Sequence, residues 1–256
     1  MHEAPLNLTH IWAAWDDNNL YLAWQFVDVT DVVDGANAGG AGSGRIGSND
    51  GILHWIALDT KPDQGATKDV WGKNANKQNV AQPLWTGANK PEFQIYLAGS
   101  LWQGFISRAV NNVFPVDDGG VNYFKILGGG SNASLGFQAG KGALFAGTSL
   151  WGVDDADARR NAGAPTRNFM TQGHSGARDS FYEIKIPLSF LGITKAQLES
   201  QGLGVMIGAG SNSTVDVLPQ DDGATLDTQG VEVWNSPLEW GDVDSITAPF
   251  ARIGAW

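Results

Sequence analysis

Short runs in which apolar residues occupy every second position are the feature that most limits how this chain can fold. The clearest run covers residues 20–28, where the alternating apolar side chains are Leu20, Leu22, Trp24 and Phe26. Alternation with a period of two is typical of a β-strand that buries one face. With 34 Gly among 256 residues and only 17% charged residues, the chain also lacks the composition of coiled coils and helical bundles. The pattern therefore favours a β-rich fold.

Comparable apolar runs predict further strands at residues 52–58, 93–97, 102–106, 181–186, 203–208 and 246–253. The run at 52–58 is apolar except for His54, which predicts a strand covered on both faces. The short segment between 93–97 and 102–106 predicts a hairpin. One helix is indicated at 195–201, because Thr194 and Gln197 have the spacing of a capping box and Gly202 supplies the stop.

These elements predict an all-β fold, a two-sheet antiparallel β-sandwich of jelly-roll or immunoglobulin-like type with long loops and one short helix near 194–201. A chain of 256 residues can bury a core of full size. The sequence contains neither an internal repeat nor a clear domain boundary, so we expect a single domain over residues 1–256.

Composition excludes several classes of function. The net charge of −11 disfavours nucleic acid and anionic membranes as partners. The absence of Cys excludes thiol catalysis, disulfides and Cys-based zinc sites. No apolar run approaches the roughly 18 residues of a membrane span. Residues 1–5 do not resemble a signal peptide, and we expect a segment of a longer secreted polypeptide rather than a cytosolic protein.

Catalytic motifs are weak. The glycines at 42, 44 and 47 match a dinucleotide-binding pattern, but no strand leads into them and no helix follows. Residues 173–176 fail as a nucleophile elbow because position 177 is Ala. The His residues lack metal-binding spacing. A glycan-cleaving enzyme with an Asp/Glu pair stays open as an alternative, because carboxylates are plentiful, yet the pattern favours a protein that is not an enzyme.

Asp residues cluster around the predicted strands 20–28 and 52–58. One interpretation is Asx turns and solvated loops. The other is structural Ca²⁺, which prefers carboxylate and carbonyl oxygens. The candidate calcium ligands are Asp28, Asp31, Asp50, Asp59 and Asp63.

The eleven Trp residues are the most informative feature for function. Three of them, Trp12, Trp24 and Trp55, lie in strand-like contexts and are predicted to be buried or half-buried. Others lie in long polar loops, where an exposed indole suits stacking on a sugar ring. The predicted platform consists of Trp71, Trp85, Trp151, Phe169 and Trp234, with Asn74, Gln78, Arg167 and His174 as polar contacts.

Two regions resemble a known family. Residues 15–31 resemble the opening of family 9 carbohydrate-binding modules and the related DOMON-like sandwiches, and residues 182–193 resemble a later strand of those domains. The last third of the chain resembles the C-terminal end of the large family 74 modules, in segments 202–207, 214–219, 242–247 and 250–254. The chain departs from that family at Val217, where the family has a Cys. The resemblance implies a starch-binding domain with calcium, attached to a bacterial amylase.

The sequence therefore predicts a secreted, non-catalytic module that binds α-glucan, such as starch and long malto-oligosaccharides, and targets an attached amylase-type enzyme. The alternatives are the glycan-cleaving enzyme, a module for a different polysaccharide, and a haem domain that would use Met170 or Met206. We expect polysaccharide and the attached catalytic domain as partners, and neither nucleic acid nor membrane.

Overall fold

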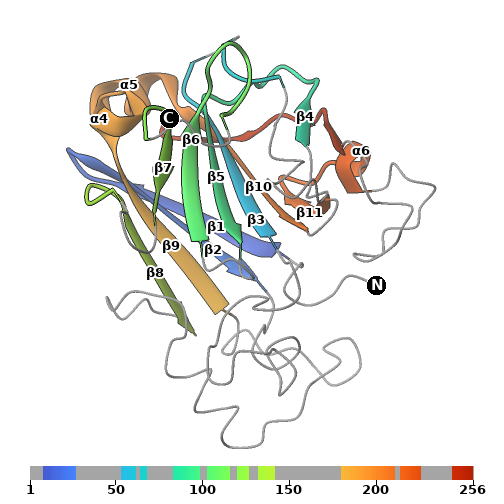
Figure 1. Cartoon of the computed structure of the whole chain (residues 1–256), viewed down its shortest axis with the longest axis horizontal. Helices are drawn as coiled ribbons and strands as arrows, with labels where there is room; N and C mark the ends of the chain where they lie inside the picture. The colour runs from blue at the N-terminus through green and yellow to red at the C-terminus, as the bar shows by residue number, and fades with distance from the viewer. Residues whose placement is uncertain are drawn as a thin grey trace, which may run out of the picture.

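The computed structural model describes residues 8–26, 53–61, 64–67, 83–98, 103–115, 120–126, 132–141, 180–210, 214–225 and 244–255. This part of the chain is mostly β, with antiparallel sheets, as the sequence predicts (Figure 1). Its helices are short, and among the described residues none has the length and hydropathy that crossing a bilayer requires. The elements are β1 (Leu8–Trp15), β2 (Asn19–Phe26), β3 (Leu53–Asp59), β4 (Pro83–Trp85), β5 (Phe93–Ala98), β6 (Gln103–Arg108), β7 (Tyr123–Lys125), β8 (Gly136–Lys141), β9 (Ser180–Pro187), α4 (Leu188–Leu191), α5 (Lys195–Gln201), β10 (Leu203–Gly210), β11 (Thr214–Leu218), α6 (Asp222–Thr225), β12 (Asp244–Ile246) and β13 (Ala251–Ile253).

The first sheet has the strand order β1-β2-β9-β8, and all of its pairs are antiparallel. The alternation in β2 places Leu20, Leu22 and Trp24 on one face, where each is fully buried. The turn before β2 forms because the Asp16 carboxylate accepts hydrogen bonds from the backbone N–H groups of Asn18 and Asn19, both at 2.7 Å. The hydrogen bond from the Asn18 backbone, followed by those from the Tyr21 hydroxyl and the Asn19 backbone, lowers the pKa of Asp16 to about 2.

The second sheet has the order β11-β10-β3-β5-β6-β7, with β13 also pairing with β10. Its central strand β3 is buried on both faces, as its apolar run predicts. Ile56 and Leu58 belong to one cluster of buried side chains, and Trp55 and Ala57 to another. The predicted hairpin is confirmed, because β5 and β6 pair from Phe93↔Arg108 to Ala98↔Gln103.

The first cluster draws on both sheets and forms the main core. It contains Leu20, Leu22 and Trp24 from β2, and Ile56, Ile95 and Ile207 from three strands of the second sheet. Inside this cluster the Trp24 Nε1–H donates a hydrogen bond of 3.0 Å to Nδ1 of His54 on β3, and both side chains are fully buried. A polar bond thus joins the two sheets within an apolar interior.

The second cluster lies on the other face of the second sheet. A parallel pair, β12 with β4, and the short helix α6 cover this face (Figure 1 labels β4 and α6). Trp85 of β4, Ile246 of β12 and Phe114 are buried in this cluster. The Trp55 ring packs against the adjacent strand at Gly208, where a Cβ atom would lie 2.1 Å from the indole. Only Gly leaves room for this contact.

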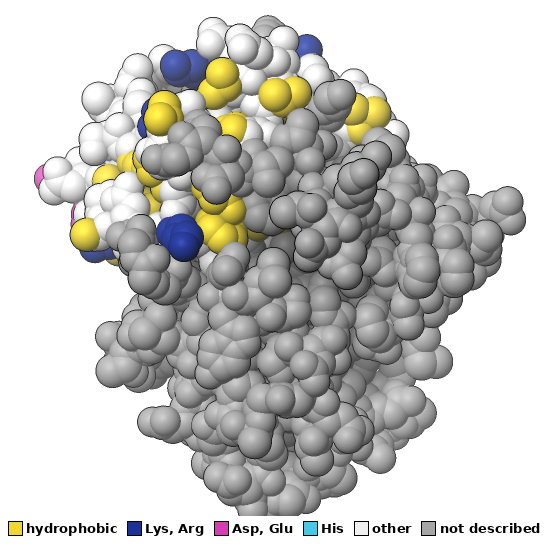
Figure 2. Space-filling view, in the orientation of Figure 1, with side chains coloured by type: hydrophobic (Ala, Val, Ile, Leu, Met, Phe, Trp, Pro, Cys, Tyr) yellow, Lys and Arg dark blue, Asp and Glu magenta, His cyan; other side chains and the backbone are white. Residues whose placement is uncertain are grey.

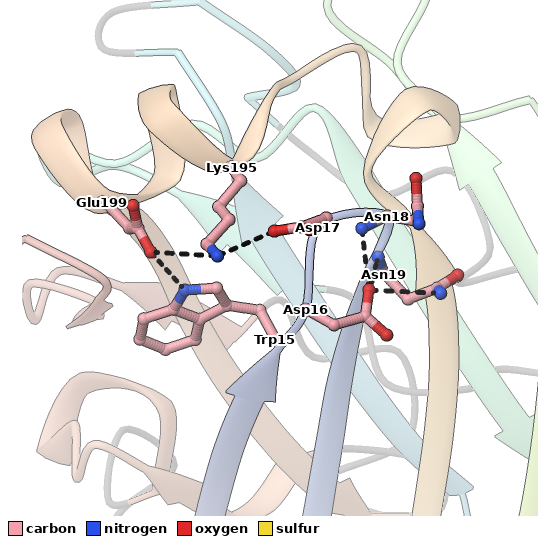
Figure 3. A network of polar contacts seen from close by, with 7 residues as sticks. All are labelled: Trp15, Asp16, Asp17, Asn18, Asn19, Lys195 and Glu199. Atoms are coloured by element: carbon pink, nitrogen blue, oxygen red, sulfur yellow. Dashed lines mark hydrogen bonds and ion pairs between the residues drawn. The ribbon is translucent and has the colours of Figure 1, made fainter.

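The predicted helix is confirmed as α5, including its capping box between Thr194 and Gln197. A polar network connects α5 to the β1–β2 turn (Figure 3). Lys195 lies between Asp17, at 2.8 Å, and Glu199, at 4.0 Å, and the Trp15 Nε1–H donates to Glu199 at 3.2 Å. These groups are exposed, so the network fixes the position of the turn more than it stabilises the fold.

Three predictions of local structure need correction. The predicted strand at 246–253 is two short strands, β12 and β13, which pair with different partners, β4 and β10. Trp12 is 43% exposed, because it points away from the core while Ile11 and Ala13 point inward. The sequence analysis also left out the strands β1, β4, β7, β8 and β11, which are short or have no polar–apolar alternation. It predicted one helix, whereas the described residues also form α4 and α6, each only four residues long.

Replacing Trp24 by Phe tests the bond between the sheets. The change removes part of the core volume. It also removes the N–H that donates to Nδ1 of His54, whose imidazole is fully buried. We expect a loss of about 2–3 kcal/mol in the free energy of unfolding, measured by urea denaturation. Trp12→Phe, on the exposed side of β1, is the matched control and should change stability by about 0.5 kcal/mol or less. Equal effects of the two substitutions would contradict the assignment.

Candidate functional site

Most of the predicted sugar-binding residues lie outside the described residues: Trp71, Trp151, Phe169, Trp234, Asn74, Gln78, Arg167 and His174. Trp85 is described, and its place in an exposed platform is wrong. It ends strand β4, is 1% exposed, and meets the ring of Phe114 edge-on at 5.7 Å. The reason is tertiary: β4 pairs with β12, which is distant in sequence, and closes the second cluster. Trp85 is a core residue.

Of the predicted calcium ligands, Asp28, Asp31, Asp50 and Asp63 lie outside the described residues. Asp59 is described and has a structural role. It is 2% exposed, and its Oδ2 accepts a hydrogen bond of 2.6 Å from Asn89, whose own Oδ1 accepts from the backbone of Phe250. Within the described ranges, no three His, Asp or Glu side chains form a group suited to a metal ion. Asp59 therefore positions the 89 and 250 loops.

Two carboxylates near the C-terminus are also structural. Asp221 is 4% exposed and accepts backbone hydrogen bonds from Gly223, Thr247 and Ala248, so it joins α6 to the segment after β12. Asp216, on β11, accepts a bond of 2.7 Å from the N–H of Leu8. This bond joins the edge of the second sheet to the first strand of the other sheet. Burial raises the pKa of Asp216 to about 6.

A polar pocket lies between four segments of the described chain, and we call it the Glu92 pocket. Its wall consists of the residues after β3, the start of β5, the end of β6 with the following turn, and α4. It encloses about 640 Å³, within the range of roughly 300–1,000 Å³ typical of small-molecule sites. Its polar side chains include Thr60, Gln64, Glu92, Arg108, Asn111 and Asn112.

Glu92 is the one acidic side chain among the residues that line this pocket. Its Oε2 accepts three hydrogen bonds, from the N–H and hydroxyl of Thr60 at 2.6 and 2.9 Å and from the N–H of Lys61 at 3.1 Å. Its Oε1 is buried and has no hydrogen-bond partner among the described residues. Burial raises the pKa of Glu92, against the lowering effect of these bonds.

Arg108, which also lines the pocket, is held in place by aromatic side chains. Its guanidinium carbon lies 5.5–5.9 Å from the ring centres of Phe93, Phe124 and Phe190, and one nitrogen donates to the carbonyl of Phe190 at 3.2 Å. Cation–π contacts of this kind fix both charge and orientation. Arg108 therefore presents donors to the pocket without having to order a flexible chain.

The turn at the pocket's edge contains two asparagines in left-handed conformation, Asn111 with φ 50° and Asn112 with φ 64°. The flanking residues Val110 and Val113 exchange both backbone hydrogen bonds, so the turn is a tight two-residue hairpin. Such turns need positive φ at both central positions, which Asn tolerates better than most residues. The turn thus places two amide side chains at one site.

The outer face of the first sheet, which points away from the first cluster, carries a second set of candidate residues. Trp12 stacks on His10, with ring centres 5.2 Å apart and an interplanar angle of 13°. Trp12 lies opposite Ala23, and Ala23 lies opposite Glu183 on β9. In the next row, Tyr21 lies opposite Lys185 and donates a hydrogen bond of 2.9 Å to Asp16. This face combines an exposed aromatic plate with polar neighbours.

No protein-family model matches the chain, and no curated protein matches it. The site is therefore interpreted from its own residues. Figure 2 shows small groups of hydrophobic side chains with Lys and Arg among them on the described part of one face, while Asp and Glu appear at its edge. Although the whole chain has a net charge of −11, acidic side chains do not dominate this part of the surface.

Sequence reasoning missed both the Glu92 pocket and the outer face. The Asn111–Asn112 pair is a recognisable turn signal, but nothing local indicates that β6 delivers it next to Glu92 and α4. Trp12 is predicted to be buried or half-buried from its strand-like context, but residues 11–15 are all apolar, which conceals the alternation. Exposure on a strand of this kind depends on which side the second sheet covers.

Replacing Asp216 by Asn tests its raised pKa. The folded-state pKa of about 6 exceeds the value of 3.8 without burial, so the native state holds a proton that the unfolded state releases, and stability falls as pH rises from about 4 to 6. Asn keeps an acceptor for Leu8 and removes the charge. We expect the stability of Asp216→Asn relative to the natural chain to increase across that window, by up to about 3 kcal/mol.

The exposed substitution Asp17→Asn controls for the loss of one negative charge. Thermal or urea unfolding measured at several pH values gives the comparison. A difference between Asp216→Asn and the natural chain that does not change with pH would contradict the prediction.

Proposed function

We propose that the chain is a non-catalytic carbohydrate-binding module of β-sandwich type that binds α-glucan, such as starch and long malto-oligosaccharides. In this proposal it belongs to a secreted bacterial polypeptide and keeps an attached amylase-type enzyme on its substrate. The resemblance of residues 15–31, 182–193 and the last third to carbohydrate-binding modules supports this assignment. The two antiparallel sheets with a shared core are compatible with a sandwich.

The observation that carries the proposal is the exposure of Trp12. In the described part of the chain, three large hydrophobic side chains are exposed, and Trp12 is the aromatic one, at 43%. An exposed indole offers a rigid apolar plate with one N–H donor, which suits stacking on a sugar ring. Its indole stacks on His10, and the opposing Ala23 is too small to cover the ring.

The neighbours of Trp12 supply the polar half of a sugar-binding surface. Sugar rings have a face rich in C–H groups, which packs on an aromatic plate, and a rim of hydroxyls, which needs donors and acceptors. On the outer face, Glu183 lies two strands away from Trp12, a separation of roughly 10 Å at ordinary strand spacing. Lys185 and Tyr21 continue the polar row. Both charge signs are present, which suits a neutral ligand.

Retention on granular starch, compared with cellulose, xylan and chitin, tests the proposal. We expect depletion by starch, and a Trp12→Ala variant should bind soluble malto-oligosaccharide about tenfold more weakly, which corresponds to about 1.4 kcal/mol. Val121→Ala is the matched control, because Val121 is an exposed apolar side chain, at 66%, on another part of the described surface. Release of reducing ends from starch by the purified chain would contradict the non-catalytic assignment.

Two outcomes would overturn the ligand assignment. Retention on cellulose, xylan or chitin but not on starch would replace α-glucan with another polysaccharide. Full starch binding by Trp12→Ala would remove the outer face from the site and leave the predicted loop residues Trp71, Trp151 and Trp234 as candidates.

We also propose structural Ca²⁺, held by the predicted ligands Asp28, Asp31, Asp50 and Asp63. Asp59 does not fit, because its carboxylate is buried against Asn89. A metal that binds only the folded state raises the melting temperature by mass action. We therefore expect a chelator to lower the melting temperature by about 2–4 °C for each kcal/mol lost, with recovery on adding CaCl₂. An unchanged melting temperature after prolonged chelation and gel filtration would contradict bound calcium.

A further inference from the structure

The Glu92 pocket lies apart from the residues on which the proposed function rests, and its chemistry points to a ligand of its own. We propose that this pocket binds one pyranose ring of a neutral sugar, with Glu92, Asn111 and Asn112 as hydroxyl ligands. The argument uses the lining of the pocket alone and does not depend on the outer face of the first sheet.

The lining excludes other classes of ligand one by one. A divalent cation needs several oxygen ligands with negative charge, and the pocket offers a single carboxylate beside Arg108 and Lys61. An anion would lie beside the Glu92 carboxylate, whose negative charge offsets the attraction of Arg108. An apolar ligand would displace water from Glu92, Gln64 and the two asparagines without offering them hydrogen bonds, which is unfavourable. A neutral molecule with many hydroxyl groups avoids all three conflicts.

The unpaired atoms of the lining match sugar hydroxyls. Glu92 uses Oε2 for three hydrogen bonds, while Oε1 is buried with no partner among the described residues. The carboxylate therefore has one acceptor left to satisfy, and a ligand hydroxyl would complete its bonding once the side chain turns toward the pocket. The amides of Asn111 and Asn112 both donate and accept, as vicinal hydroxyls require. The half-buried ring of Phe190 at the pocket wall supplies an apolar surface.

The pocket is also preorganised. Arg108 is clamped by aromatic rings and by the carbonyl of Phe190, and the asparagine turn is closed by the bonds between Val110 and Val113. The carbonyl of Asn112 additionally accepts a bond of 3.1 Å from the N–H of Thr67, which fastens the turn to the segment after β3. A site whose ligands are fixed in advance loses little entropy on binding.

Methyl α-D-glucopyranoside is the probe, titrated into the ¹⁵N-labelled natural chain and followed by NMR. We expect saturable shifts of the side-chain amide signals of Asn111 and Asn112, with a dissociation constant on the order of 1 mM, while the Trp12 indole N–H reports on the outer face. Sodium phosphate and CaCl₂ are titrated in parallel. Absence of saturable shifts with the glucoside, or larger shifts of the asparagine amides with phosphate or Ca²⁺, would overturn the proposal.

Two variants test the assigned residues. The double substitution Asn111→Gly and Asn112→Gly removes both amides and keeps the turn, because Gly adopts positive φ readily, so the melting temperature should hold while glucoside affinity falls at least tenfold. Glu92→Gln keeps an oxygen for Thr60 and replaces the charged acceptor, and it should weaken binding by about tenfold. Undiminished glucoside affinity in both variants would overturn the proposal. If the glycine variant does not fold, the NMR titration of the natural chain tests the proposal instead.

The two proposals fail independently. Loss of starch retention in Trp12→Ala with intact glucoside shifts at Asn111 and Asn112 separates the pocket from the outer face. Starch retention by the natural chain without any glucoside response in the pocket keeps the proposed function and removes this inference.

Discussion

The hydrogen bond from Trp24 to His54 is the contact on which the arrangement of the two sheets depends. It crosses from β2 to β3 in the middle of the first cluster, where both side chains are inaccessible to water. Because Nδ1 of His54 accepts, the ring carries its proton on Nε2. The surrounding cluster would tolerate several ways of sliding one sheet over the other, since apolar packing is not directional. A single polar pair that must meet in the interior allows few of them, so it selects the register between the sheets.

That register sets the two-sided burial of the second sheet. Once Ile56 and Leu58 face the first sheet, the alternate residues Trp55 and Ala57 must face the other way, and they need a second cover. The parallel pair β4–β12 and α6 supply it, fastened by the Asp221 carboxylate through bonds to Thr247 and Ala248. The apolar content of the chain is thus divided between two cores. This division explains why Trp85, which looks exposed in the sequence, is in fact buried.

The two candidate binding regions are what remains after both cores are filled. On the outer face of the first sheet, no described segment buries Trp12, and its side chain is 43% exposed. The Glu92 pocket forms where the end of β6, the start of β5 and α4 meet the chain after β3. Neither region could be found from spacing along the chain, because each brings together side chains more than 80 positions apart, such as Arg108 and Phe190. Their polarity and their mixture of charges support the proposal of a neutral, hydroxyl-rich ligand.

The sequence by itself determined the features that depend on near neighbours. The alternation of apolar side chains in 20–26 specified β2, and the continuous apolar run before Asp59 specified a β3 covered on both faces. The spacing of Thr194 and Gln197 specified the N-terminal cap of α5. These signals are local, since side-chain direction in a strand and bonding at a helix end follow from adjacent residues. Only the tertiary structure decided that the segment 246–253 divides between two sheets, that Asp59 holds Asn89, and that Trp12 rather than Trp85 is exposed. Whether a side chain is exposed depends on which groups pack against it. For these side chains, those groups come from distant parts of the chain.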